Sequence, residues 1–254
     1  MIGHARSAVR LRASSKNYHE GKWRGSIQED MAIQVELIKS IPYFSGLSSA
    51  ELDSLKGLIF ESTAERGEFI VMESEPADAL YFVISGVVKV FKTSADGREQ
   101  ILQLVRPGES FNDVPVFDGG QNPASAQAMG PVVLYRIKNR DMGVILRTHP
   151  QVALNVIHVL SQKLRHLVSL VEDLSFKHVT ARLAKILLEY AGNGAGPAKP
   201  RLTQQEMAAM AGTAREMIGR SLKELEDEKI IRLEHHRIVV TDKEALKKWA
   251  GVVE

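Results

Sequence analysis

The chain has 254 residues, of which 44% are hydrophobic and 25% charged, and this composition is typical of a globular protein of one or two domains. It contains no cysteine, which excludes disulfides, thiolate metal sites, cysteine-ligated iron–sulfur clusters and cysteine nucleophiles. Its apolar runs are shorter than the roughly 18 residues of a membrane-spanning helix, and the first residues lack the apolar core of a secretory signal. We therefore expect a cytoplasmic protein with no membrane partner.

The formal net charge of +2 is divided unevenly along the chain. Residues 31–146 carry a net charge of −5, whereas residues 1–30 and residues 176–254 carry +3 each. This asymmetry predicts domains with different partners. Two interpretations of residues 1–30 remain open. In the first, these residues are an irregular tail or sequence upstream of a true start at Met31. In the second, they form a basic arm that contacts DNA phosphates or covers the next domain.

Residues 33–58 are predicted to be helical, and Ser48 followed by Glu51 fits a capping box. From Phe60 onwards the hydrophobic period changes to two, and Gly-containing turns separate short β-branched or aromatic runs. These runs cover residues 69–71, 80–84, 87–91, 101–105 and 132–137. Such regularly spaced short strands predict an antiparallel jelly-roll β-barrel over residues 31–146, within a chain of α+β class.

Residues 147–175 are predicted to form one long helix that begins near Pro150. Six aliphatic residues in it are spaced alternately by three and four positions, as at the a and d positions of a coiled coil. They are Ile157, Leu160, Leu164, Leu167, Val171 and Leu174. This seam predicts parallel homodimerisation. The alternative is a helix packed only on its own barrel, which requires a wider apolar stripe.

Residues 176–254 are predicted to form a separate winged helix-turn-helix domain. An amphipathic helix over residues 178–191 is followed at 192–200 by a loop rich in Gly and Pro. Further along, residues 230–240 have the pattern of a β-hairpin, which would form the wing.

The helix-turn-helix lies between that loop and the hairpin. Thr203 with Glu206, and Thr213 with Glu216, both match the capping-box pattern, which predicts the starts of two short helices. Gly212 lies between them and is expected in the turn.

The second of these helices carries Arg215, Glu216 and Arg220 within an arc of about 140°. Arg donates bidentately to guanine, and Glu accepts from the cytosine amino group, so this face is predicted to contact G·C base pairs of double-stranded DNA. In the alternative, Glu216 only closes its capping box and Arg220 only pairs with Glu216 or Glu224. The candidates for phosphate contacts are surface polar residues, namely Thr203, Gln205, Thr213, His236 and Arg237.

The order of these elements resembles the Crp/Fnr superfamily of bacterial transcription regulators over about residues 33–248. The matching segments are Leu80 to Gly86, Asp96-Gly97-Arg98-Glu99, Pro107-Gly108-Glu109, and above all Gly212-Thr213-Ala214-Arg215-Glu216-Met217-Ile218-Gly219-Arg220. The resemblance implies a cyclic-nucleotide-binding-like sensor barrel, a dimerisation helix and a winged DNA-binding domain, with RNA polymerase and a small-molecule effector as partners. The spacing of Arg215, Glu216 and Arg220 is similar to that of the branch that recognises TGTGA-like half-sites.

The chain departs from the nucleotide-binding members at the positions that hold the ligand. Those members bind the ribose with a Gly-Glu pair and the cyclic phosphate with an Arg-Ser or Arg-Thr pair, whereas this chain has Asn112-Asp113 and Pro123-Ala124 there. No Lys or Arg occurs from residue 107 to residue 135. Because a buried phosphate without a cation is costly, we expect that cyclic AMP is not the effector.

The candidate effector pocket is instead largely apolar and suits a flat hydrophobic ligand or none. It comprises Asn112, Asp113, Val114, Pro123, Ala124, Ser125, Leu167 and Val168. The last two stand on the long helix, where the nucleotide-binding members have a polar pair that meets the base.

Haem is a second candidate cofactor, because relatives in this superfamily use it to sense nitric oxide or carbon monoxide. Haem iron needs an axial ligand, but residues 31–148 contain no histidine. The remaining candidates are His4, His19, His149, His158 and His166, each of which is otherwise a solvated histidine. A jelly-roll enzyme with a basic appendage is a hypothesis from another class, but it needs a catalytic constellation, and the sequence shows no paired acids, His cluster or Ser-His-Asp pattern. A metal oxygenase of this fold would need a His cluster inside the barrel. We therefore expect a regulator and not an enzyme.

Overall fold

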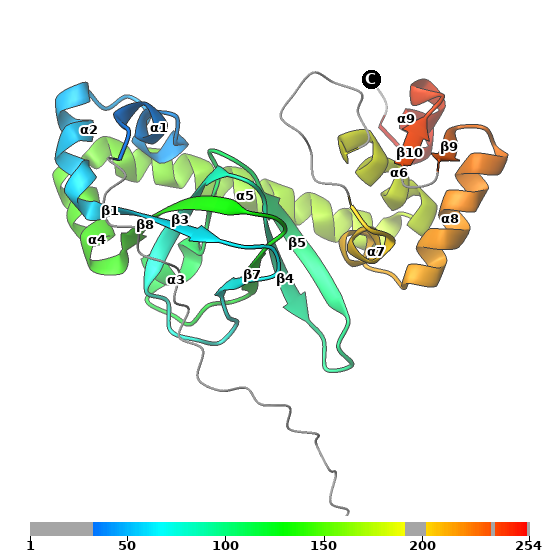
Figure 1. The fold of residues 1–254 in the computed structure, drawn as a ribbon, viewed down its shortest axis with the longest axis horizontal. Coiled ribbons are helices and arrows are strands. Elements are labelled where there is room, and N and C mark those ends of the chain that lie inside the picture. Colours follow the sequence, from blue (N-terminus) through cyan, green and yellow to red (C-terminus); the bar gives the residue numbers. More distant parts are fainter. Residues whose placement is uncertain (1–32, 191–201, 235–236, 253–254) are drawn as a thin grey trace, which may run out of the picture.

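The computed structural model describes residues 33–190, 202–234 and 237–252. The predicted arm at 1–30, the loop at 192–200 and His4, His19 and His236 therefore lie outside the described residues. In Figure 1 a β-barrel and a helical C-terminal domain are joined by one long helix. No helix in the described part is long and apolar enough to cross a bilayer.

Four short helical segments close one end of the barrel (Figure 1). They are α1 (Val35–Lys39), the 3₁₀ turn η1 (Pro42–Phe44), α2 (Ser49–Leu55) and the 3₁₀ turn η2 (Lys56–Leu58). The predicted capping box is confirmed, because Ser48 accepts from the Glu51 amide and Glu51 accepts from the Ser48 amide at 2.8 Å. These segments bury Ile38, Tyr43 and Phe44 in the core.

Two four-stranded antiparallel sheets form the jelly-roll barrel that the sequence predicts. Their orders are β1-β8-β3-β6 and β2-β7-β4-β5. The strands are β1 (Ile59–Ala64), β2 (Phe69–Val71), β3 (Ala79–Ser85), β4 (Val88–Thr93), β5 (Glu99–Val105), β6 (Ser110–Phe111), β7 (Ser125–Ala128) and β8 (Val132–Lys138). A Cβ at Gly86, which follows β3, would stand 2.4 Å from the Pro131 carbonyl oxygen, so only glycine fits that turn.

Two helices of the barrel were not expected from the sequence. Helix α3 (Asp113–Asp118) lies between β6 and β7, and α4 (Asn139–Thr148) follows β8. Both are short: α3 has one turn, and α4 buries only Met142 and Ile145, so neither leaves a long helical period in the sequence.

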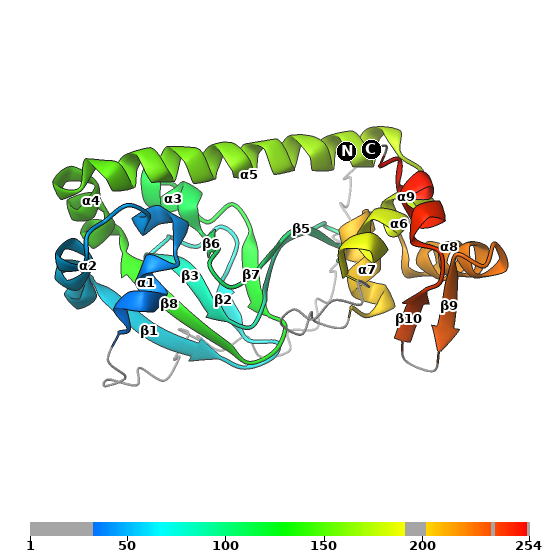
Figure 2. The same ribbon diagram turned by 90° about the horizontal axis from the view of Figure 1, so that it is seen from above.

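Helix α5 (Pro150–Phe176) is the long helix that the sequence predicts, and Pro150 occupies its first turn. Its 27 residues span about 40 Å. Figure 2 shows α5 lying along one side of the barrel and continuing to the C-terminal domain. Val152 and Val156 are buried against the barrel core, which fixes the first third of the helix.

The C-terminal domain is the predicted winged helix-turn-helix. Its elements are α6 (Val179–Tyr190), α7 (Gln204–Ala211), α8 (Arg215–Asp227), β9 (Ile231–Glu234), β10 (Arg237–Val240) and α9 (Lys243–Ala250). Strands β9 and β10 pair antiparallel to form the wing. Buried Leu183, Met207, Ile218 and Leu222 pack α6, α7 and α8 together.

One of the two predicted capping boxes in this domain is wrong. Thr203 and Glu206 form the box at the start of α7, but α8 begins at Arg215 with Ala214 as N-cap and no capping side chain. The reason is the turn: Gly212 adopts a left-handed conformation (φ 61°), and the Thr213 amide donates to the Ala208 carbonyl at 3.0 Å. Thr213 therefore still completes the end of α7.

Candidate DNA interface and effector site

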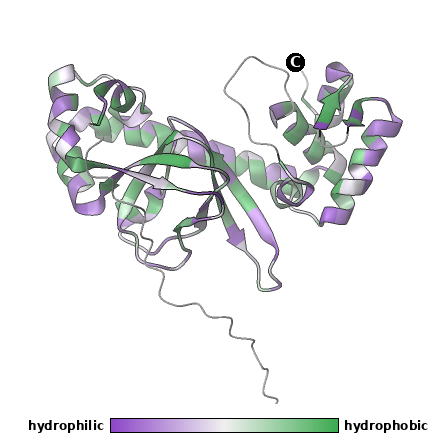
Figure 3. Cartoon of the chain, viewed as in Figure 1, coloured by the Kyte–Doolittle hydropathy of each residue, from purple (hydrophilic) through white to green (hydrophobic). Residues whose placement is uncertain are grey.

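The outer face of α8 carries the three residues predicted to contact bases, and all three are exposed. Ile218, Leu222 and Leu225 are buried on the opposite face, so packing alone orients the polar face outwards. Figure 3 shows that hydrophilic residues predominate on α8.

The alternative roles for this face were a capping box for Glu216 and an ion pair for Arg220, and the structure shows neither of them. Arg220 donates only to the Met217 sulfur, at 3.9 Å, and forms no ion pair with Glu216 or Glu224 among the described residues. Glu224 instead accepts from the Thr180 hydroxyl at 2.8 Å, which ties α8 to α6. Glu216 closes no capping box. The positive and negative groups of this face are thus available to a partner.

The candidates for phosphate contacts are scattered around the same domain. Gln205 and Arg237 are exposed, on α7 and on the wing. The Thr203 hydroxyl accepts from the Glu206 amide at 3.1 Å, and Thr213 is half-buried in the turn. Gln205 and Arg237 are therefore exposed to a partner, whereas the Thr203 hydroxyl caps its own helix.

Helix α5 presents an apolar stripe to solvent. Of the six predicted seam residues, Ile157, Leu164, Leu167 and Val171 are exposed, and Leu164 and Val171 have 63% of their surface accessible. Leu160 and Leu174 are half-buried within their own chain. Three further exposed hydrophobic residues of α5 were not part of the predicted seam: Leu154, Val168 and the last residue of the helix, Phe176. We call the set Leu154, Ile157, Leu164, Leu167, Val168 and Val171 the α5 stripe. An apolar stripe of this length that no described residue covers is typical of a protein interaction surface.

The residues of the predicted effector pocket differ in their exposure. Ala124 and Ser125 are buried where β7 begins, whereas Pro123 and Val114 are exposed. Leu167 and Val168 lie on the exposed stripe of α5. Asn112, with φ 65°, donates its amide to the Ala79 carbonyl at 3.0 Å.

Asp113 is buried in a polar network that the sequence did not predict. Its carboxylate accepts from the Tyr43 hydroxyl, from the Ser110 hydroxyl at 2.7 Å and from the Lys163 ammonium. Lys163 also donates to the Ser110 carbonyl at 2.7 Å. Burial, together with the Asp113 charge, raises the pKa of Tyr43 far above its ordinary value, so the phenol stays protonated and donates. The network fastens α5 to the barrel.

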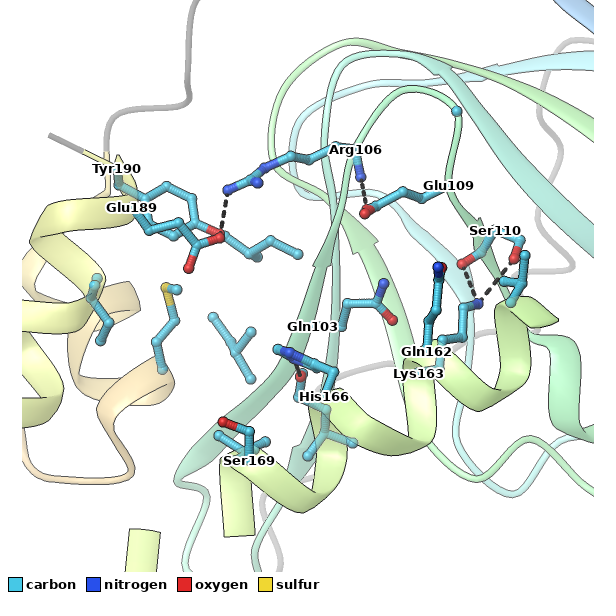
Figure 4. Close-up of a pocket in the computed structure, with 18 of the residues that line it drawn as sticks. Gln103, Arg106, Glu109, Ser110, Gln162, Lys163, His166, Ser169, Glu189 and Tyr190 are labelled. Atoms are coloured by element: carbon cyan, nitrogen blue, oxygen red, sulfur yellow. Dashed lines mark hydrogen bonds and ion pairs between the residues drawn. The ribbon is translucent and has the colours of Figure 1, made fainter. Parts of the chain in front are cut away.

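A cavity of about 520 Å³ lies between β5, α5 and α6 (Figure 4). None of the eight predicted pocket residues lines it. Its apolar wall includes Leu104, Leu170, Ile186 and Met210. Its polar wall includes Gln103, Arg106, Lys163, His166, Lys185 and Glu189.

Two sets of contacts join the sensor barrel to the DNA-binding domain beside this cavity. Arg106 forms an ion pair with Glu189 at 2.9 Å, and its guanidinium lies 4.9 Å from the centre of the Tyr190 ring. Phe91, Ile101 and Leu104 of the barrel form an apolar cluster with Ala209 of α7. The orientation of the DNA-binding domain is therefore linked to the position of β5.

Asp173 holds the start of the DNA-binding domain to the end of α5. It pairs with Lys177 at 2.9 Å and with Lys185 of α6. Burial opposes its ionisation, but the two lysines outweigh this effect and hold the pKa of Asp173 below its usual range.

The three described histidines that were candidate haem ligands each have a protein partner. His149 lies 2.8 Å from the Thr148 hydroxyl, and His158 lies 2.9 Å from the Gln162 amide. His166 lies 3.3 Å from the Leu102 carbonyl, and it alone of the three lines the cavity.

Comparison with known proteins identifies both parts of the chain. Residues 61–149 match the cyclic nucleotide-binding domain family, and residues 181–249 match the Crp-like helix-turn-helix domain family. The chain is 32% identical over 213 residues to the cyclic AMP receptor protein of Thermus thermophilus, an alignment that covers 84% of this chain and 98% of that protein.

Two further relatives align over nearly their whole length. The CRP-like cAMP-activated global transcriptional regulator of Mycobacterium tuberculosis is 29% identical over 221 residues, which are 85% of this chain and 99% of that protein. The solved structure of a CRP/FNR-family transcriptional regulator from Thermus thermophilus has 26% identity and a TM-score of 0.64, and covers 75% of this chain and 98% of its own. The chain belongs to the Crp/Fnr superfamily and is a DNA-binding transcription regulator of that family.

Proposed function

We propose that this regulator acts as a homodimer in which two α8 helices contact TGTGA-like half-sites of one palindrome. The observation that supports this most directly is the exposed face of α8, where two arginines and one glutamate have no carboxylate or capping partner among the described residues. In such dimers the two helices lie one DNA turn apart, about 34–36 Å, in successive major grooves. RNA polymerase is a further proposed partner, on the resemblance to the family alone.

Dimerisation rests on the α5 stripe. A second copy is the partner whose own stripe matches in length and in spacing, because four residues of the stripe belong to the predicted seam, which repeats at the three- and four-residue steps of a coiled coil. A parallel pair would place the two α8 helices on the same side of the dimer, as a palindrome requires.

Within each half-site, Arg215 and Arg220 would donate to guanine O6 and N7, and Glu216 would accept from a cytosine amino group. Arg220→Ala should then weaken binding to the palindrome by about 1–3 kcal/mol and relax the preference at one G·C pair in each half-site. Fluorescence anisotropy with the palindrome and with single-pair variants measures both effects.

Lys243→Ala is the matched control, because it removes one exposed positive charge from another helix of the same domain. If Arg220 contacts a base, Arg220→Ala should bind the palindrome more weakly than the wild type does. On DNA in which the contacted base pair has already been changed, the variant and the wild type should bind with similar affinity. If Arg220→Ala weakens binding to all sequences equally, Arg220 is a phosphate contact and the assignment fails.

The proposed effector is not cyclic AMP, although the two relatives above are named for it. Pro123 and Ala124 supply no side-chain donor where the phosphate would lie, and the Lys163 ammonium is already neutralised by Asp113. Cyclic AMP should therefore leave the thermal unfolding midpoint of the protein unchanged, because a ligand raises that midpoint only if it binds the folded state. A midpoint that rises with nucleotide concentration would overturn this part of the proposal.

A haem-based nitric oxide or carbon monoxide sensor is the second candidate function. The observation that favours it is His166 at the wall of the cavity, because haem iron needs such a ligand. An absorbance spectrum of haem-reconstituted protein tests it. A Soret band that shifts with nitric oxide and is lost in His166→Ala supports haem sensing, and a featureless spectrum removes it.

A further inference from the structure

The cavity between β5, α5 and α6 is built by three parts of the chain at once. Ile101 to Leu104 come from the sensor barrel, Gln162 to Asp173 from the long helix, and Arg182 to Tyr190 from the first helix of the DNA-binding domain. Any occupant would touch all three. Its binding free energy would therefore differ between arrangements of the two domains, which is what effector control requires.

The charged groups around the cavity favour an anion. Four Arg or Lys side chains and one histidine face three carboxylates. The carboxylates are already engaged: Glu189 pairs with Arg106, Asp173 pairs with Lys177 and Lys185, and Glu109 accepts from the Arg106 main-chain amide at 2.7 Å. Lys163 is neutralised by Asp113, whereas Arg182 donates to the Ala211 and Lys177 carbonyls and has no carboxylate partner among the described residues. Two of the three carboxylates, Glu189 and Asp173, are thus already paired with cations.

Two side chains of the sensor barrel have unused hydrogen-bond donors at this cavity. Arg106 uses part of its guanidinium for Glu189 and for the Tyr190 side chain, which leaves the rest of its N–H groups for a ligand. The Gln103 amide, which extends into the space in Figure 4, likewise has no hydrogen-bond partner in the part of the chain that the structure covers. Both side chains line the cavity, and both can donate hydrogen bonds to an acidic group.

The opposite wall is aliphatic. Leu104, Leu170, Ile186 and Met210 belong to β5, α5, α6 and α7 respectively, and they would contact the body of the ligand. Pockets for small organic ligands commonly combine such an apolar lining with a few convergent polar groups.

We propose that this cavity is the effector site, and that it takes an organic anion with an apolar body whose acidic group is bound by Arg106 and Gln103. The proposal rests on effector control as proposed above, but it moves the site from the barrel interior to the junction of the two domains. Because Arg106 also pairs with Glu189 of α6, the acidic group would compete with the contact that joins the domains.

The experiment uses the full-length protein and the neutral fluorescent dye N-phenylnaphthylamine as a reporter of the apolar cavity. Octanoate and octylamine, which have the same aliphatic body and opposite charge, are the competitors. We expect saturable dye binding at one site per chain. Octanoate should displace the dye at a concentration about tenfold lower than octylamine does, because one charge-assisted hydrogen-bond pair provides a difference in affinity of this size. Octanoate should also change the affinity for the palindrome.

Three variants locate the site. Gln103→Trp fills the cavity and should weaken dye binding at least tenfold, whereas Arg98→Trp, at the exposed tip of the same hairpin, should leave it unchanged. Arg106→Gln should retain the dye but lose the preference for octanoate over octylamine.

The proposal is overturned if the dye does not bind, if Gln103→Trp binds it as wild type does, or if octylamine competes as well as octanoate. Displacement by octanoate with no change in DNA affinity would also contradict an effector role. The dye measurements need no DNA, so a protein without sequence preference would refute the proposed function and leave the ligand site to be judged separately.

Discussion

Leu164→Asp is expected to yield a monomer whose affinity for the palindrome is about 10²- to 10⁴-fold lower than that of the wild type. Leu164 has 63% of its surface exposed in the single chain, so the substitution disturbs no intramolecular packing. In a parallel pair the two new carboxylates would meet in the apolar seam, where their repulsion and desolvation disfavour association. Sedimentation gives the oligomeric state, and anisotropy with the palindrome gives the affinity.

The matched control is His158→Asp, which places the same carboxylate on the same helix at an exposed position beside the α5 stripe. It should remain a dimer with wild-type DNA affinity. If Leu164→Asp also sediments as a dimer, the α5 stripe is not the interface. If it is a monomer that binds the palindrome as tightly as the wild type, the two half-sites are not bound as a linked pair.

Lys163→Met should lower the free energy of unfolding by about 3–5 kcal/mol, because it leaves the buried Asp113 carboxylate without its cation. The hydrogen bonds from Tyr43 and Ser110 remain, but they compensate only part of the charge. Urea unfolding followed by tryptophan fluorescence and by circular dichroism measures the loss.

Two comparisons separate this effect from lost packing. Lys56→Met removes the exposed ion pair with Asp53 and should leave the unfolding midpoint almost unchanged. The double variant Lys163→Met with Asp113→Leu removes both charges and should recover most of the stability. A single variant as stable as the wild type would show that Asp113 does not depend on Lys163.

The elements that the sequence predicted correctly have long or regular patterns. The 27-residue helix α5 has a sustained three- and four-residue spacing, and the strands of the barrel alternate between short apolar runs and turns. The Ser48 and Thr203 capping boxes are set by residues three positions apart, so local sequence is enough to place them.

The errors and omissions arise where tertiary structure decides. Thr213 fits a capping box in sequence, but the left-handed Gly212 and the preceding helix use Thr213 to end α7. The sequence prediction did not include Lys163, because it considered only cations within residues 107–135. Lys163 reaches the barrel from α5 and lies fifty positions after Asp113 in the sequence. A single lysine within the apolar part of α5 was the signal available in the sequence.

The cavity could not be predicted at all, because its walls come from β5, α5, α6 and α7, and no local pattern brings these together. The same holds for the ion pair of Arg106 with Glu189, whose residues are 83 positions apart. The predicted pocket relied on positions aligned with nucleotide-binding relatives. In this chain Asn112 and Asp113 at those positions bond to their own protein instead.

Selection of bound sequences from random duplex DNA by the purified protein, in parallel with Arg220→Ala, tests the proposed DNA recognition most directly. We predict enrichment of an inverted repeat of TGTGA-like half-sites whose centres are one helical turn apart, with one G·C pair of each half-site relaxed in the variant. Enrichment of a single unrepeated site, or no enrichment, would contradict recognition by a pair of α8 helices.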